Sequence, residues 1–99
     1  MVLEHALITV RPGTASDFES ALREARAVIA ASPGFLSLEL HRGVESPGQF
    51  LLLVEWETVE DHMVGFRESD AFGRWRGLIG PFFDSPPVVE HFTPVDGLF

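Results

Sequence analysis

The sequence lacks cysteine, lysine, tyrosine and asparagine. Without cysteine, disulfides, thiol nucleophiles and thiolate metal ligands are all excluded. Schiff-base catalysis needs a lysine amine, and a phenolic proton donor needs tyrosine, so both are excluded as well. No apolar run approaches about 20 residues, and the amino-terminal segment has no basic region of the kind that opens a signal peptide. We therefore expect a cytoplasmic protein with no membrane span and no membrane partner.

Positive charge is also scarce. Seven arginines stand against fifteen aspartates and glutamates, which gives a formal net charge of −8. Binding to a phosphate backbone needs a basic face, so this balance argues against a nucleic-acid partner. A chain of 99 residues is expected to form one domain over 1–99, with a core over 1–94 and a tail over 95–99.

Hydrophobic periodicity predicts six elements in the order strand, helix, strand, strand, helix, strand. The expected strands cover 3–10, 35–42, 49–57 and 88–93, and the helices start at the caps Thr14 and Thr58. Ser69-Asp70 breaks the second helix in two. This order is typical of the α+β class with the ferredoxin-like βαββαβ layout, in which both helices cover one face of a four-stranded antiparallel sheet.

The first and third strands are apolar on both faces, although helices can cover only one face of such a sheet. An uncovered apolar face needs a partner. We therefore expect a symmetric homodimer in which two sheets pack face to face.

The stretch from Trp56 to Arg76 combines apolar stripes with ionisable residues. At helical spacing, the first stripe is Val59, His62, Met63, Phe66 and the second is Phe72, Trp75, Arg76, Ile79. A polar group on a buried face costs free energy unless it finds a partner. This stretch is therefore the expected wall of a pocket.

Each ionisable candidate has a structural and a functional interpretation. His62 is either a core histidine satisfied by a carbonyl or carboxylate, or a pocket base. Arg76 either pairs with a carboxylate such as Glu55 or Glu90, or stabilises an anionic substrate. His5 approaches His62 if its strand face is the helix side, and otherwise lies at a strand end near solvent.

Aromatic side chains are dense in the second half of the chain, and they serve either as core or as a flat apolar pocket. The candidates for such a pocket are Trp56, Phe66, Phe72, Trp75 and Phe83, with Phe82 beside them. His41 and His91 could join His5 in binding a metal ion, but no pair has metal-ligand spacing within one helix. We therefore expect no metal site.

Three segments carry a family resemblance: Ser32–Arg42, Pro47–Trp56 and Phe66–Phe72. With their Pro-Gly, Glu-Trp and Ser-x-x-Phe landmarks, the chain from about Leu3 to Pro94 resembles the antibiotic biosynthesis monooxygenase (ABM) domain family. The resemblance implies a dimeric α+β barrel with a pocket between each sheet and its broken second helix. Members of that family include cofactor-free monooxygenases of aromatic polyketides, haem-degrading enzymes, and enzymes of quinone or signal-molecule metabolism.

The haem-degrading branch of that family uses an asparagine, a tryptophan and a histidine ligand. The matching positions here are His5, Phe66 and Arg76, so none of these residue types is kept, and an arginine cannot ligate iron. Haem degradation is therefore not expected. The aromatic-polyketide branch relies on tyrosine, asparagine, tryptophan and arginine, of which this chain supplies only the last two.

These observations predict a cofactor-independent monooxygenase, or a related small-molecule enzyme, for an aromatic, quinone-like or enolisable substrate. His62 would move a proton, with His5 as a second candidate, and Arg76 would stabilise the anion. The substrate carbanion would react directly with oxygen, so neither a metal nor a flavin is needed. The alternative is a non-catalytic ligand-binding or interaction domain of the same fold, which the missing tyrosine and asparagine favour.

Overall fold

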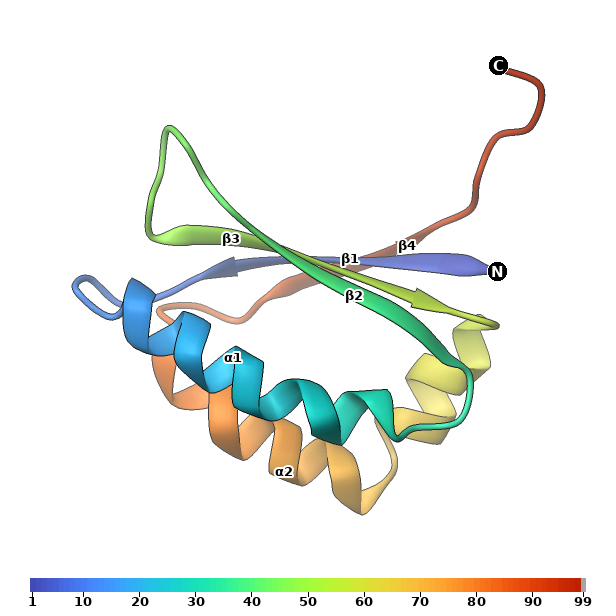
Figure 1. The fold of residues 1–99 in the computed structure, drawn as a ribbon, viewed down its shortest axis with the longest axis horizontal. Coiled ribbons are helices and arrows are strands. Elements are labelled where there is room, and N and C mark those ends of the chain that lie inside the picture. Colours follow the sequence, from blue (N-terminus) through green and yellow to red (C-terminus); the bar gives the residue numbers. More distant parts are fainter. Residues whose placement is uncertain (99) are drawn as a thin grey trace.

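The computed structural model describes residues 1–98 and shows a four-stranded sheet with helices on one side only (Figure 1). The strands are β1 (Val2–Thr9), β2 (Phe35–Arg42), β3 (Gln49–Trp56) and β4 (Val88–Phe92), in the spatial order β2-β3-β1-β4. The helices are α1 (Ala15–Ala30), η1 (Asp61–Phe66), α2 (Asp70–Ile79) and the short η2 (Gly80–Phe82). Every strand pair is antiparallel. The predicted ferredoxin-like α+β fold is therefore confirmed.

The helix α1 is amphipathic, and its inner stripe contributes to the core. Phe18, Leu22, Ala25 and Ile29 are buried, at the spacing of one helix face. α1 and α2 lie side by side beneath the sheet (Figure 1). Within residues 1–98, no helix has the length and apolar character needed to cross a membrane.

The two predicted helix caps behave differently. Thr58 accepts a hydrogen bond from the backbone N–H of Asp61 at 3.1 Å, as the capping pattern predicts. Thr14 precedes α1 as predicted, but its hydroxyl donates to the carbonyl of Arg11 at 2.6 Å instead of capping the helix. The turn formed by Arg11, Pro12 and Gly13 thus competes for the side chain that the helix would use.

Strand alternation decides which side chains meet the helices. Val2, Glu4, Ala6 and Ile8 of β1 are buried on the helix side, opposite the buried residues of β3, namely Phe50, Leu52, Val54 and Trp56. Glu4 is the one ionisable residue in these two rows. The sheet therefore carries a carboxyl group into the layer between sheet and helices.

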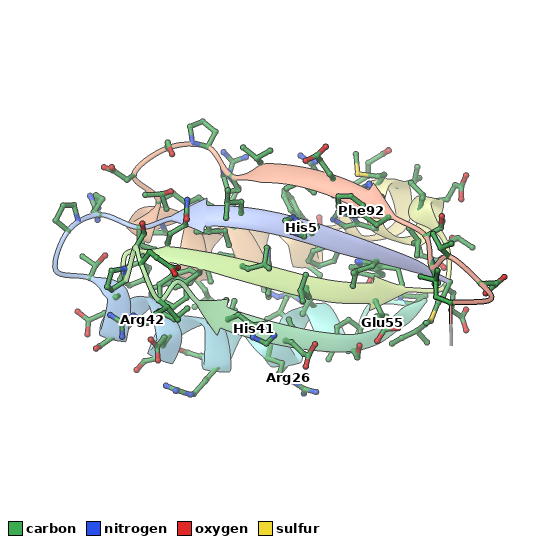
Figure 2. All side chains as sticks on the ribbon, turned by 90° about the horizontal axis from the view of Figure 1, so that it is seen from above. His5, Arg26, His41, Arg42, Glu55 and Phe92 are labelled. Atoms are coloured by element: carbon green, nitrogen blue, oxygen red, sulfur yellow. The ribbon has the colours of Figure 1, made fainter. Side chains whose placement is uncertain are left out.

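The other sheet face is open, and it carries His5. This side chain alternates with Glu4 and Ala6 along β1, points away from the helices, and contacts the Phe92 ring at a centroid distance of 5.3 Å (Figure 2). Of the two interpretations of His5, the one that placed it on the helix side near His62 is wrong. The strand's own alternation is the reason, since burying Glu4, Ala6 and Ile8 turns His5 outward.

The segment η1 is π-helical, which changes the predicted stripe. The backbone N–H of Arg67 bonds to the carbonyl of His62 at 2.9 Å, so the turn is one residue wider than in an α-helix. His62 and Phe66 are buried, whereas Val59 and Met63 are exposed. The expectation that all four share a buried face assumed an α-helical period, and the wider turn makes it wrong. The break before α2 at Ser69 is confirmed.

Candidate functional site

A cavity of about 940 Å³ lies between the helix side of the sheet, α2 and the segment that leads to β4. Its walls include Ala6, Ile8, Ile29, Leu52, Phe66, Phe72, Trp75, Ile79, Phe83 and Val89. The polar side chains on the same walls are Glu4, His62, Arg67, Arg76, Asp84 and Ser85. The site therefore combines apolar walls with a few polar groups, among them two arginines and the pair of Glu4 and His62, as is usual for a small-molecule pocket.

Glu4 is held at the cavity wall by two contacts to the same carboxyl oxygen. The indole Nε1–H of Trp56 donates to Oε1 at 3.0 Å, and Nε2 of His62 lies 3.2 Å from that oxygen. Within residues 1–98, no fully buried side-chain oxygen lacks a hydrogen-bond partner. Oε2, which takes part in neither contact, is thus the oxygen open to the cavity.

His62 has a close polar contact at each ring nitrogen. Besides the contact to Glu4, its Nδ1 lies 2.8 Å from Nε2 of His91, a residue of β4. The imidazole also stacks on the indole of Trp56, with ring centroids 5.2 Å apart and planes inclined by 16°. The ring is therefore fixed in place by contacts to three strands.

Burial governs the electrostatics of this pair. It raises the pKa of Glu4 from 4.5 to about 7, against the hydrogen bond from Trp56 and the nearby charge of Arg67, which both lower it. Burial also lowers the pKa of His62 from 6.5 to about 4, and the charges of His91 and Arg67 add to this shift. Between these two values both groups are neutral, so their contact of 3.2 Å is not an ion pair.

The structure brings most of the predicted site residues to one cavity. His62, Arg76, Phe66, Phe72, Trp75 and Phe83 all line it. Trp56 does not line it, because this fully buried indole lies behind His62. His5 is absent from the site, since it occupies the other face of the sheet.

Arg76 does not have the partners suggested by its structural interpretation. Glu55 lies on the open face with Ser37, whose hydroxyl bonds to it at 2.8 Å, and Glu90 lies opposite His5 on that same face. Arg76 forms no ion pair with any carboxylate of residues 1–98. Its guanidinium is therefore available to the cavity.

Sequence reasoning missed Glu4, His91 and Arg67. The sequence offered one sign of Glu4, which is a lone acid in an apolar strand. The strand alone, however, does not show which of its two faces is buried. His91 was considered only as a metal ligand with His41, which lies on the open face (Figure 2). Within the described part of the chain, no three histidine or acidic side chains are arranged to hold a metal ion.

The sheet, the helices that cover one of its faces and the cavity between them define a small α+β protein with a pocket on its helix side. The ABM family model, described as antibiotic biosynthesis monooxygenase, matches residues 1–78. The uncharacterized protein YczJ of Bacillus subtilis is 40% identical over 95 residues, which are 96% of this chain and 100% of YczJ. The chain therefore belongs to the ABM family.

Two solved structures extend the comparison. A structure from Bordetella bronchiseptica named for the same family is 42% identical, with a TM-score of 0.93, and the match covers 95% of this chain and 96% of that one. SnoaB, a cofactor-independent oxygenase from Streptomyces nogalater, is 21% identical with a TM-score of 0.77, over 98% of this chain and 95% of its own. The TM-score of 0.77 at an identity of 21% shows that SnoaB has the same fold as this chain.

Proposed function

We propose that this protein is a cofactor-independent monooxygenase for an aromatic, quinone-like or enolisable substrate. The observation that carries the proposal is the close contact of Glu4 and His62, with Oε1 and Nε2 3.2 Å apart, on the wall of a cavity of about 940 Å³. Membership of the ABM family supports it. The fold shared with SnoaB, a cofactor-independent oxygenase, is consistent with it.

The walls of the cavity suit a flat apolar substrate that becomes an anion. Phe66, Phe72 and Trp75 offer aromatic faces and edges to such a ring system. Arg76 and Arg67 place positive charge on the same cavity. A guanidinium placed beside the reacting atoms stabilises an enolate or peroxide anion as its charge develops.

The proposed chemistry converts a CH₂ group beside an aromatic ketone into a carbonyl. The Glu4–His62 pair removes one proton, and the resulting carbanion gives its electron pair to O₂, so that a C–O bond forms. The peroxide anion takes up a proton. Loss of the second C–H proton then breaks the O–O bond and leaves a carbonyl, while the departing hydroxide takes up a proton to become water. The sum is CH₂ + O₂ → C=O + H₂O, with O₂ as the only oxidant.

Oxygen uptake with quinol and anthrone-type polyketide substrates tests this proposal. We expect His62→Ala and Arg76→Ala to reduce the rate by about 10²-fold or more, the range for loss of an acid–base or anion-stabilising group. Arg74→Ala is the matched control, because Arg74 is an exposed arginine of the same helix that does not line the cavity. Equal rates in all four proteins would remove His62 and Arg76 from the mechanism.

A second candidate function is non-catalytic binding of an apolar ligand in the same cavity. The observation that favours it is that both nitrogens of His62 already have close polar contacts within the protein. In that case the cavity would bind hydrophobic aromatics, seen as quenching of tryptophan fluorescence, without consuming oxygen. Binding with no oxygen uptake for any quinol or anthrone would favour this function over the first.

We also propose that the chain, as one domain with its core over 1–94, works as a homodimer joined through the open sheet face. That face carries apolar residues on three strands, among them Leu7, Leu53, Val88 and Phe92. An apolar surface of this extent is stabilised by a partner, and a second copy offers the same surface about a two-fold axis. The helices of both subunits would then lie on the outside, and each cavity would remain complete within its own subunit.

A further inference from the structure

Three side chains from three separate elements form one continuous row of close polar contacts. Glu4 of β1 contacts His62 of η1, with Oε1 and Nε2 3.2 Å apart, and His62 contacts His91 of β4, with Nδ1 and Nε2 2.8 Å apart. Glu4 and His62 line the cavity and are 5% and 4% exposed. His91 is half-buried, does not line the cavity, and belongs to an edge strand of the sheet. The row therefore starts inside the cavity and ends at the rim of the molecule.

We infer that Glu4, His62 and His91 form a proton path that connects the cavity with solvent at the sheet edge. Glu4 is the catalytic residue of this path, because its free Oε2 is the atom open to the cavity. His62 passes the proton on, and His91 is a positioning residue that exchanges the proton with water. The role in turnover rests on the proposed function, whereas the path itself is a property of the free protein.

The path has two states that differ in the place of every proton. In the first state Glu4 is protonated and donates from Oε1 to Nε2 of His62, whose Nδ1–H donates to Nε2 of His91, so that His91 carries its proton on Nδ1. In the second state Glu4 is ionised and accepts from Nε2–H of His62, whose Nδ1 accepts from Nε2–H of His91. Passing from the first state to the second moves one proton along each bond and releases one from Nδ1 of His91.

The surroundings of His62 favour transfer through neutral rings. Trp56 from β3 covers one face of the imidazole, and Phe66 from η1 lies near it at a centroid distance of 6.5 Å. Arg67, which follows η1, brings positive charge close to both His62 and Glu4. Burial and these neighbours together lower the pKa of His62 to about 4, so a resident imidazolium is disfavoured. Arg76 lines the same cavity from α2.

Such a path meets a need of the proposed reaction. Each turnover takes two protons from carbon and delivers two to oxygen, all inside a cavity whose reacting wall is buried. The protons balance over a whole turnover, but they leave carbon and reach oxygen at different steps. Exchange with solvent through the path would return Glu4 to its carboxylate between those steps.

The tautomers of the two histidines test the path without any substrate. In the full-length protein labelled with ¹⁵N-histidine, we expect His62 to change from the Nδ1–H to the Nε2–H tautomer, and His91 with it, as Glu4 loses its proton near pH 7. Glu4→Gln removes the titrating group and should abolish the change in both rings. A His62 that keeps one tautomer throughout, or becomes an imidazolium in this range, would overturn the inference.

Turnover gives a second test that separates the path from the proposed function. His91→Gln keeps a hydrogen-bonding side chain beside His62 but cannot pass a proton on. At low buffer concentration we expect it to lower oxygen uptake by about ten- to a hundredfold, with recovery when imidazole is added. His41→Ala, an exposed histidine of the open face, is the matched control. If added imidazole does not restore the rate of His91→Gln, the path is refuted. If the wild type consumes no oxygen, only the proposed function is refuted.

Discussion

The imidazole of His62 lies flat on the indole of Trp56, and that indole also donates a hydrogen bond to Glu4, the partner of the same imidazole. One tryptophan thus fixes both members of the acid–base pair. Trp56 is fully buried at the end of β3, and Phe35 contacts its ring edge-on at 6.0 Å. The geometry of the site therefore depends on a residue that the cavity does not touch.

The first prediction concerns the indole N–H of Trp56. Trp56→Phe keeps an aromatic ring against His62 but removes the donor to Oε1 of Glu4. Because that bond lowers the pKa of Glu4, we expect the pKa to rise above about 7 in the variant. Loss of the buried bond should reduce the free energy of unfolding by about 1–3 kcal/mol. Carboxyl ¹³C titration and urea denaturation measure the two effects.

Trp75→Phe is the control for that substitution. Trp75 is also an almost fully buried indole, but it contacts Phe66 and has no bond to Glu4. Trp75→Phe should lose stability through packing alone and leave the pKa of Glu4 unchanged. Equal Glu4 pKa values in wild type and Trp56→Phe would show that the indole bond has no influence on the carboxyl group.

The second prediction concerns the dependence of stability on pH. The pKa of Glu4 is higher in the folded state, so its contribution to stability is present below pH 4.5 and is lost as the pH rises to about 7. The pKa of His62 is lower in the folded state, so its contribution is present above pH 6.5 and is lost as the pH falls to about 4. Between pH 4.5 and 6.5 the two slopes oppose each other, and the pair should leave the wild-type stability nearly level.

Single substitutions of the pair should expose each slope. In Glu4→Gln, the free energy of unfolding should fall on acidification from pH 6.5 to 4, with a slope of up to about 1.4 kcal/mol per pH unit. In His62→Gln, the free energy of unfolding should instead fall as the pH rises from 4.5 to 7. His91 and Arg67 remain in both variants as common neighbours. Urea denaturation series at several pH values measure the slopes, and parallel curves for the two variants would contradict the assigned pKa shifts.

The fold could be predicted from the sequence because strands and helices leave local periodic patterns. The choice of sheet face could not, because both rows of β1 are mainly apolar. The row with Glu4 is the buried one, and Trp56, 52 positions later, supplies a hydrogen-bond donor to its carboxyl group. The π-turn of η1 was equally hidden, since the predicted stripe assumed the α-helical period, and Val59 and Met63 turned out exposed. Long-range pairing therefore defines the acid–base part of the site.

The third prediction concerns the turn that starts β2 beneath η1. Gly34 has a φ of +86°, and a Cβ added there would overlap the side chain of Asp61, the first residue of η1. Gly34→Ala should therefore combine backbone strain of about 1–2 kcal/mol with a displacement of η1 that disturbs the contacts of His62. Thermal unfolding and the ¹⁵N shifts of His62 measure the two effects.

Gly13→Ala separates strain from overlap in that experiment. Gly13 has a similar φ of +80°, but an added Cβ would meet no atom within 4 Å. Gly13→Ala should therefore lose about the same stability through backbone strain and leave the ¹⁵N shifts of His62 unchanged. Identical losses of stability in the two variants, with no change at His62 in either, would contradict the proposed role of Gly34 in positioning η1.

The fourth prediction concerns the open sheet face. Leu53 lies opposite His5 on the two central strands, and its side chain points away from the helices. In a dimer joined through this face, Leu53→Asp would bury two carboxylates across the two-fold axis, so we expect sedimentation analysis to show a monomer. Val44→Asp, in an exposed loop, should leave the dimer intact. Because the cavity belongs to the other side of the sheet, the His62 tautomers should be the same in monomer and dimer, and a wild type that sediments as a monomer would refute the proposed interface.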